Sequence, residues 1–113
     1  MTVVEMPSYR MDASAVWTDD ERFEMIAFVA GNPEAGEVMP DTGGARKLRW
    51  GVAGRGKRSG ARVIYYFHSE LMPLFLLNVF AKNEKANLTK AERNQVAVLI
   101  PRLVAGYRIK KTP

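Results

Sequence analysis

The segment from Gly43 to Phe67, GGARKLRWGVAGRGKRSGARVIYYF, decides the fold. On either side of its glycine-rich centre, apolar residues alternate with basic ones. Successive side chains of a strand point to opposite faces of a sheet, so this alternation predicts two strands joined by a loop. We therefore expect strands at Arg46–Val52 and Ala61–His68, forming a hairpin with a glycine-rich tip.

The hairpin is also the most basic part of the chain. Seven of the 17 Lys and Arg residues lie in it, and no acid occurs between Thr42 and Ser69. Residues 1–41 carry nine acids and two basic residues, a net charge of −7, whereas residues 42–113 carry three acids and fifteen basic residues, a net charge of +12. This split predicts an anionic partner that binds mainly the C-terminal part.

Length and composition exclude several classes of protein. A chain of 113 residues, 47% hydrophobic and 26% charged, fits a single domain spanning 1–113. With no Cys and one His, His68, the sequence offers no thiolate or histidine-rich metal site, and we expect neither metal nor cofactor. No apolar run reaches the roughly 18 residues of a membrane span, and the N-terminus lacks a signal-peptide layout, so we expect a cytoplasmic protein with no membrane partner.

The N-terminal third is expected to hold a strand and two helices. A short apolar strand at 3–6 ends at Pro7, and residues 8–16 favour a short helix. The capping-box sequence TDDE, residues 18–21, begins a second helix over 19–30. Residues at helical spacing give its expected buried stripe: Phe23, Ile26, Ala27 and Ala30.

A connector rich in Pro, Gly and Asp, residues 32–44, leads into the hairpin and is expected to lack regular structure. After the hairpin, the nearly continuous apolar run 71–81 predicts a strand that is covered on both faces.

A second capping box, Thr89 to Glu92, begins a C-terminal helix, which Pro101 is expected to kink or restart. The buried stripe of this helix is expected at Val96, Leu99, Ile100 and Leu103. The order of elements predicts an α+β protein.

The hairpin tip imitates a nucleotide-binding loop. Residues 51–57 fit the pattern GxxxxGK, but Arg58 follows where a Ser or Thr would hold Mg²⁺, and a strand follows where a phosphate loop opens a helix. We therefore interpret the tip as a hairpin loop. Its three cations, Arg55, Lys57 and Arg58, suit contact with a phosphate backbone.

Five cations are candidates for a binding site on the sheet. Lys47 and Arg49 share a strand face, and a plain hairpin would bring Arg62 to the same side. A bulge in the glycine-rich region would instead flip the second strand, so the sequence leaves the register open. Lys82 and Lys85 join the group if the following strand is adjacent. Cations that converge in this way are costly to fold unless an anion fills the site.

Such a group suits RNA cleavage by the 2′-hydroxyl as internal nucleophile. The reaction needs a base for the 2′-hydroxyl, positive charge for the phosphorane and an acid for the leaving 5′-oxygen. A lysine among other cations can serve as the base, because its neighbours disfavour the charged form, whereas arginine stays protonated and stabilises charge. The acid stays open among Lys57, Lys82 and Lys85.

The chain resembles the RelE/HigB superfamily of bacterial toxins, in particular the HigB-like, phage-derived branch. The motifs that carry the resemblance are TGG-x-RK-x-RW at 42–50, GRGKR-x-GARVIYY at 54–66 and AKNEK at 81–85. The resemblance implies an α+β fold: a small antiparallel sheet of three to four strands, two N-terminal helices and one C-terminal helix. It implies the toxin of a type II toxin–antitoxin module, which cuts mRNA in the ribosomal A site, contacts ribosomal RNA and is silenced by a helix-turn-helix antitoxin.

The resemblance also implies roles for single residues. Its catalytic positions match Lys47, Arg49, Arg62 and Lys82, with Lys47 as candidate base and the others as stabilisers of phosphate charge. Five further cations are expected to bind RNA: Arg46, Arg55, Lys57, Arg58 and Lys85. This chain differs from some relatives, which have a lysine in place of Arg49, a tyrosine near Leu88 or a histidine near the end. Two alternatives remain: a non-catalytic RNA- or ribosome-binding protein on the same scaffold, and an interaction module that binds no nucleic acid.

Overall fold

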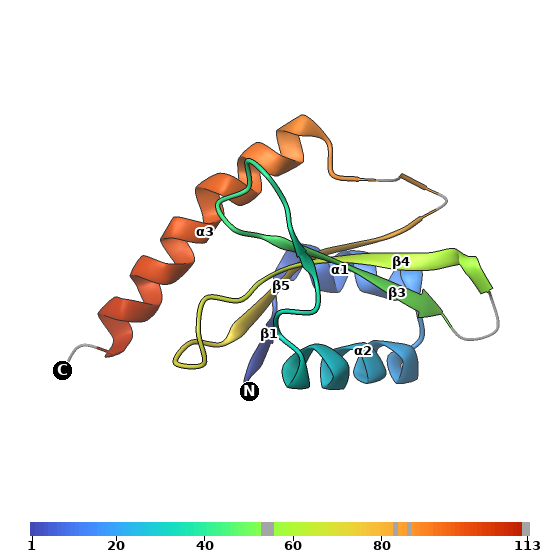
Figure 1. Cartoon of the computed structure of the whole chain (residues 1–113), viewed down its shortest axis with the longest axis horizontal. Helices are drawn as coiled ribbons and strands as arrows, with labels where there is room; N and C mark the ends of the chain where they lie inside the picture. Colours follow the sequence, from blue (N-terminus) through green and yellow to red (C-terminus); the bar gives the residue numbers. More distant parts are fainter. Residues whose placement is uncertain (53–55, 83, 86, 112–113) are drawn as a thin grey trace.

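A five-stranded mixed sheet is the centre of the protein (Figure 1). The structure is a computed structural model that describes residues 1–52, 56–82, 84–85 and 87–111, with the side chains of 52–59 and 108–111 excepted. The elements are β1 (Val3–Glu5), α1 (Pro7–Val16), α2 (Asp19–Gly31), β2 (Glu37–Val38), β3 (Arg46–Val52), β4 (Gly56–Tyr66), β5 (Leu74–Ala81) and α3 (Lys90–Lys111).

The predicted α+β class is confirmed, with two helices before the hairpin and one after β5. The strand order is β1-β5-β4-β3-β2. The sheet therefore has more strands than the three to four expected, and it is not wholly antiparallel, because β1 pairs with β5 in parallel. After β1 the chain leaves the sheet, forms α1 and α2, and returns to the sheet at β2. Because of this long connection, β1 can pair with β5 in parallel.

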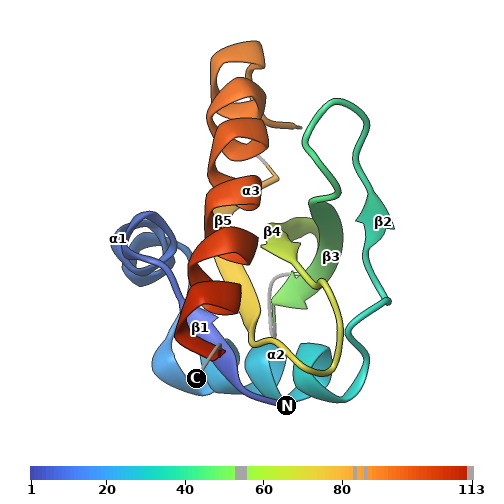
Figure 2. The same ribbon diagram turned by 90° about the vertical axis from the view of Figure 1, so that its left-hand side faces the viewer.

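The two faces of the sheet are covered by different helices (Figures 1 and 2). On one face, Val63 and Tyr65 of β4 pack with Tyr9 of α1 and Met25 of α2 in one apolar cluster. On the other face, Ile64 belongs to a second cluster together with residues of α3. The side chains of β4 are buried from Ala61 to Tyr66, so neither face of this part of the strand is exposed to solvent.

The predicted caps form. Thr18 Oγ1 accepts a hydrogen bond from Glu21 N at 3.3 Å, and the Glu21 carboxylate accepts one from Thr18 N at 3.0 Å. At α3, Glu92 N donates to Thr89 Oγ1 at 3.1 Å and Thr89 N donates to the Glu92 carboxylate at 2.8 Å. Each box satisfies two amides at its helix start, which explains why both helices begin where the sequence predicts.

The predicted buried stripe of α2 is only partly right: Ile26 packs against the core, but Phe23 and Ala27 do not face it. Met25 and Val29 are the buried residues of this helix, whereas Phe23 is 55% exposed and Ala27 is exposed. The sequence FEMIAFVA carries two overlapping apolar stripes, and packing against the sheet selects the one that the spacing argument did not choose.

Other boundaries also differ from expectation. The strand β5 begins at Leu74 rather than 71, because the chain turns before Pro73, with Met72 N donating to Ser69 O at 3.2 Å. The predicted second hairpin strand, 61–68, begins earlier, at Gly56. The expected connector contains the short strand β2. The helix α3 runs through Pro101 without a restart. No helix among the described residues has both the length and the apolar character needed to cross a membrane.

A buried tyrosine attaches the connector to the sheet. The Tyr65 hydroxyl donates to Pro33 O at 2.7 Å and accepts from Gly36 N at 2.8 Å. Burial is the main reason that the pKa of Tyr65 is raised, so the hydroxyl keeps its proton for this contact. A Cβ at Gly36 would lie 2.8 Å from Tyr65 Cε1, so only glycine fits against the ring. This contact holds the chain that leads into β2.

The substitution Tyr65→Phe should lower the free energy of unfolding by about 2 kcal/mol, because it leaves the buried amide of Gly36 and the part-buried carbonyl of Pro33 without a partner. Urea unfolding followed by circular dichroism measures the loss. Tyr66→Phe is the matched control: the Tyr66 hydroxyl lies 3.0 Å from Nδ1 of the exposed His68, so its removal should cost less than about 1 kcal/mol. Equal losses would contradict the anchoring role of Tyr65.

Candidate functional site

Three of the predicted catalytic residues line one pocket. This pocket has a volume of about 310 Å³, and its lining includes Arg49, Arg62 and Lys82. We call it the arginine pocket. The other lining residues are Trp50, Gly51 and Gly60, so the pocket lies at the hairpin end of the sheet.

Strand pairing brings these side chains together. Arg49 of β3 pairs directly with Arg62 of β4, and Arg62 pairs with Phe80 of β5, so all three side chains project from one face. Lys82 follows β5, and its amide donates to Gly60 O at 2.9 Å. The pairing of β3 with β4 shifts its register between Trp50 and Val52, so the hairpin is irregular near its glycine-rich tip. Arg49 and Arg62 nevertheless pair directly and lie on one face, as the plain-hairpin alternative expected.

Arg62 is a buried cation without an acidic partner in the described part of the chain. Its exposed fraction is 9%, and the one hydrogen bond that its side chain forms within the described residues, from Nη1 to Ala61 O, is long at 3.4 Å. Burial, and then the charge of Arg49, lower the pKa of Arg62. None of the described residues that line the arginine pocket is acidic. The described lining of the pocket therefore carries three cationic side chains and no acidic one.

Lys47, the candidate base, lines a different pocket. It shares a face of β3 with Arg49, two positions away, and is half-buried. The second pocket, about 120 Å³ in volume, lies between β2, β3 and the start of α3. We call it the β2 pocket; its lining includes Glu37, Val38, Pro40, Lys47, Asn87 and Arg93. The predicted catalytic set is therefore divided between two pockets on the same face.

Arg46 faces the opposite side of the sheet from Lys47. Its Nη1 donates to Gly36 O at 2.8 Å and to Glu34 O at 3.2 Å. These bonds hold the connector beside Tyr65, with which Arg46 pairs across the strands. The structure therefore does not bring this predicted RNA-binding residue to either pocket.

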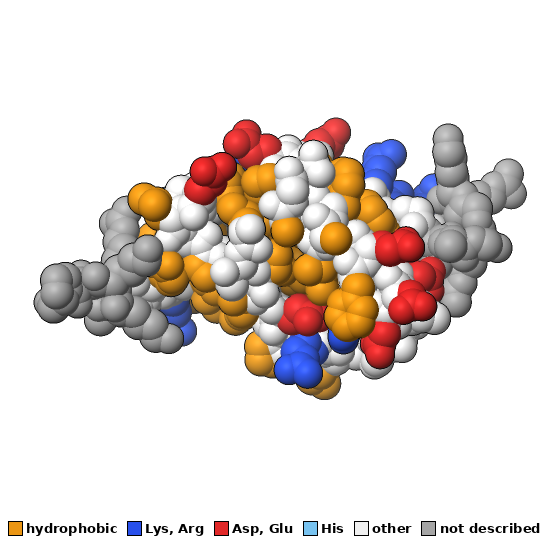
Figure 3. Space-filling model, turned by 90° about the horizontal axis from the view of Figure 1, so that it is seen from below, with side chains coloured by type: hydrophobic (Ala, Val, Ile, Leu, Met, Phe, Trp, Pro, Cys, Tyr) orange, Lys and Arg blue, Asp and Glu red, His pale blue; other side chains and the backbone are white. Residues whose placement is uncertain are grey.

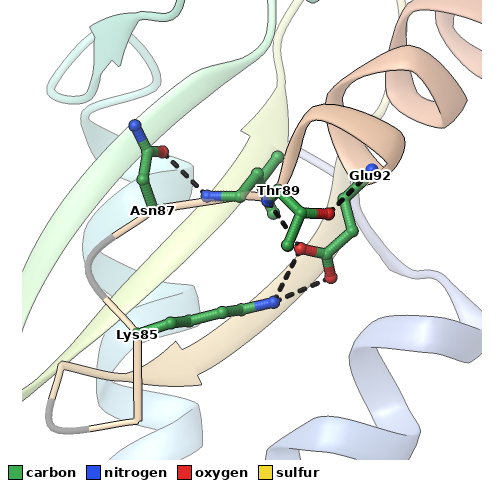
Figure 4. A network of polar contacts seen from close by, with 5 residues as sticks. Lys85, Asn87, Thr89 and Glu92 are labelled. Atoms are coloured by element: carbon green, nitrogen blue, oxygen red, sulfur yellow. Dashed lines mark hydrogen bonds and ion pairs between the residues drawn. The ribbon is translucent and has the colours of Figure 1, made fainter.

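Lys85 is held by a carboxylate (Figure 4). Its Nζ donates to both oxygens of Glu92, at 2.7 and 2.8 Å, and lies 5.0 Å from the centre of the Phe80 ring. Burial by itself would raise the pKa of Glu92, but hydrogen bonds from Lys85 and Thr89 outweigh it and lower the pKa. Lys85 thus reinforces the cap of α3 and lies outside the arginine pocket.

The tip cations are not placed. Arg55 and the side chains of Lys57 and Arg58 lie outside the described residues, so their predicted contact with RNA stays a prediction. The sequence argument did not single out Trp50, Asn87 or Arg93, which line the two pockets. Asn87 precedes the capping box of α3 and Arg93 follows it, soon after Lys82 and Lys85 in the chain. This closeness in sequence to two candidate cations was the one signal that could have pointed to Asn87 and Arg93.

Acidic side chains gather on the face opposite the two pockets. Seen from the side of α2, the surface carries acidic and hydrophobic side chains next to one another (Figure 3). Asp19, Asp20 and Glu24 are exposed on this helix. These exposed acids of α2 therefore lie on the side of the sheet away from Arg49 and Arg62.

No family model matches the chain. The resemblance to RelE/HigB toxins therefore stays a prediction from the sequence motifs.

The buried charge of Arg62 should reduce stability. Arg62→Met should raise the free energy of unfolding by about 1 kcal/mol, because an unpaired guanidinium no longer has to be desolvated. The same variant should elute from a heparin column at lower salt. Arg49→Met, at an exposed position of the same pocket, should change stability by less than about 0.5 kcal/mol while weakening heparin retention similarly. A clear loss of stability in Arg62→Met would show that the guanidinium supports the fold.

Lys82 and Lys85 form a matched pair of lysines with opposite expected effects. Lys85→Ala should lower the free energy of unfolding by about 1 kcal/mol at neutral pH and leave heparin retention nearly unchanged. Lys82→Ala should instead weaken heparin retention and leave the free energy of unfolding nearly unchanged. The lowered pKa of Glu92 contributes stability above the unfolded-state pKa, and this contribution is lost as the pH falls through the folded-state pKa. The stability difference between Lys85→Ala and the wild type should therefore shrink below about pH 4.

Proposed function

We propose that this protein is a RelE/HigB-like toxin of a type II toxin–antitoxin module, a ribosome-dependent endoribonuclease that cuts mRNA. The arginine pocket carries the proposal: Arg49, Arg62 and Lys82 converge there, and no acid is present among the described lining residues. A pocket of this charge suits a phosphodiester whose charge grows in the transition state. The RelE/HigB motifs in the sequence supply the choice of mRNA among the possible polyanions.

In the proposed reaction, the scissile phosphate lies between the guanidinium groups of Arg49 and Arg62. The amine of Lys47, which lines the adjacent β2 pocket, is the base that takes the proton of the 2′-hydroxyl. The 2′-oxygen then forms a bond to phosphorus, and the bond from phosphorus to the 5′-oxygen breaks. Lys82 gives its proton to the leaving 5′-oxygen. The products are a 2′,3′-cyclic phosphate and a free 5′-hydroxyl.

The choice of Lys82 as the acid follows from the placement of the three candidates. Lys82 lines the arginine pocket, whereas Lys85 is held by Glu92. The side chain of Lys57 lies outside the described residues. Arginine is a poor proton donor in proteins, so Arg49 and Arg62 are assigned to charge stabilisation and not to the role of the acid.

The proposed setting is the cytoplasm, where the enzyme acts on mRNA in the ribosomal A site and touches ribosomal RNA. A helix-turn-helix antitoxin would silence it. These partners rest on the resemblance of the motifs at 42–50, 54–66 and 81–85 to RelE/HigB toxins.

One observation favours a second candidate function. The candidate base Lys47 lines its own pocket, apart from the three cations that would hold the phosphate. A protein that binds RNA or the ribosome without cutting needs no base beside the phosphate. A non-catalytic protein on the same scaffold is therefore the alternative.

Cleavage on programmed ribosomes tests the proposal. With EDTA present, wild type should produce new mRNA ends at A-site codons, with a 2′,3′-cyclic phosphate on the upstream fragment, detected by primer extension and phosphatase treatment. Arg62→Met and Lys82→Ala should each reduce the rate about 100-fold or more, because each removes a charge that stabilises the transition state. Arg102→Ala, at an exposed position of α3 outside both pockets, should cut normally.

Two results would contradict the proposed endoribonuclease activity. If wild type produces no new ends but binds ribosomes with a steep salt dependence that Arg62→Met weakens, the non-catalytic alternative is correct. If binding to ribosomes is absent, or does not change with salt, both nucleic-acid proposals fail and the protein is an interaction module for another partner.

A further inference from the structure

The β2 pocket has the chemistry of a nucleotide site, and neither the capping box nor the packing of the sheet explains it. Its two cations come from different elements, Lys47 from β3 and Arg93 from the first turns of α3. Within the described part of the chain, neither cation forms an ion pair. Glu37, the one acid among the described lining residues, pairs with Lys47 across β2 and β3, so the half-buried Arg93 is the cation that an external anion would engage.

The remaining lining residues suit a base. Val38 is 57% exposed, and with Pro40 it offers an apolar surface against which a planar ring can pack. Asn87 Oδ1 accepts from Leu88 N at 2.9 Å, an interaction that orients the side chain and leaves its amide donors without a described partner. Glu37 would repel a phosphate, but its carboxylate can accept hydrogen bonds from a base edge. A volume of about 120 Å³ suits one such group.

The two pockets are neighbours on one face. Lys47 and Arg49 are two residues apart on β3, so their Cα atoms are separated by about 7 Å. This separation is short enough for one nucleotide to connect the pockets. A single strand with its reacting phosphate in the arginine pocket would therefore place its next nucleotide in the β2 pocket.

We propose that the β2 pocket binds the nucleotide next to the cleaved bond, with Arg93 on its phosphate and with Asn87 and Glu37 on the edge of its base. The proposal rests on the RNA substrate proposed above and extends it to a specificity site. Arg93, Asn87 and Glu37 are binding residues here, and none of them takes part in the proton transfers. They should therefore affect affinity and base preference more than the rate of the chemical step.

The charge contact is tested by binding. The probe is a ribosome–mRNA complex that carries a 2′-deoxynucleotide at the cleavage site, so that no reaction occurs. Arg93→Ala should weaken binding about tenfold and reduce the slope of log affinity against log salt by about 1. Lys90→Ala removes the same charge from the same helical turn outside the pocket, and both quantities should stay near their wild-type values.

The base contact is tested by cleavage of four mRNAs that differ only in the base next to the cleaved bond. Wild type should cut them at rates that spread roughly fivefold or more, and Asn87→Ala and Glu37→Gln should each reduce the spread to less than about twofold. Lys90→Ala should retain it. A merely structural role for Asn87 or Glu37 would slow all four mRNAs alike and leave the spread unchanged.

The outcomes separate this inference from the proposed function. If wild type cuts mRNA but the Arg93, Asn87 and Glu37 variants match it in affinity, salt slope and base preference, the β2 pocket is not a nucleotide site and the endoribonuclease stands. A wild type without base preference at this position overturns the assignment of Asn87 and Glu37. If neither wild type nor any variant cuts mRNA, but the protein binds the 2′-deoxy complex with a salt slope that depends on Arg93, the β2 pocket is a nucleotide site and the protein is not an endoribonuclease.

Discussion

The cross-strand pair of Arg49 and Arg62 is the constraint on which the candidate site depends. Like charges directly opposite one another in a sheet are destabilising, and Arg62 is almost fully buried besides. The apolar neighbours of Arg62, from Ala61 to Tyr66, fix β4 between the two cores and hold the unfavourable pair in register. The packing of the fold thus offsets the unfavourable energy of this pair and keeps three cationic side chains in one pocket.

The cations of the hairpin region serve different purposes once the chain is folded. Arg46 and Lys85 are used by the protein itself, on backbone carbonyls of the connector and on the capping box of α3. Arg49, Arg62 and Lys82 have no described acid and face a shared pocket. A count of the basic residues in a segment therefore overestimates how many of them can bind a partner. A carboxylate or carbonyl elsewhere in the chain can bind a cation that has no partner in the local sequence.

Local signals predicted the elements well where one interaction decides the outcome. The capping boxes at Thr18 and Thr89 fixed two helix starts, because the bonds of a box lie within four residues. The buried stripe of α2 was predicted only in part, because both of its apolar stripes satisfy helical spacing and only the sheet distinguishes them. The strand β2 was missed, because two residues carry no periodicity and this strand forms through pairing with β3.

By itself, the sequence determined the α+β class, the hairpin, the charge split and the set of cations to examine, because alternation, capping and composition are local properties of the chain. Only the tertiary structure decided which cations meet. Lys82 joins Arg49 and Arg62 because β5 pairs with β4, and Lys47 is separated into the β2 pocket because β2 and the start of α3 close over it. These neighbours come from distant parts of the chain, and no local pattern records which distant segments fold together.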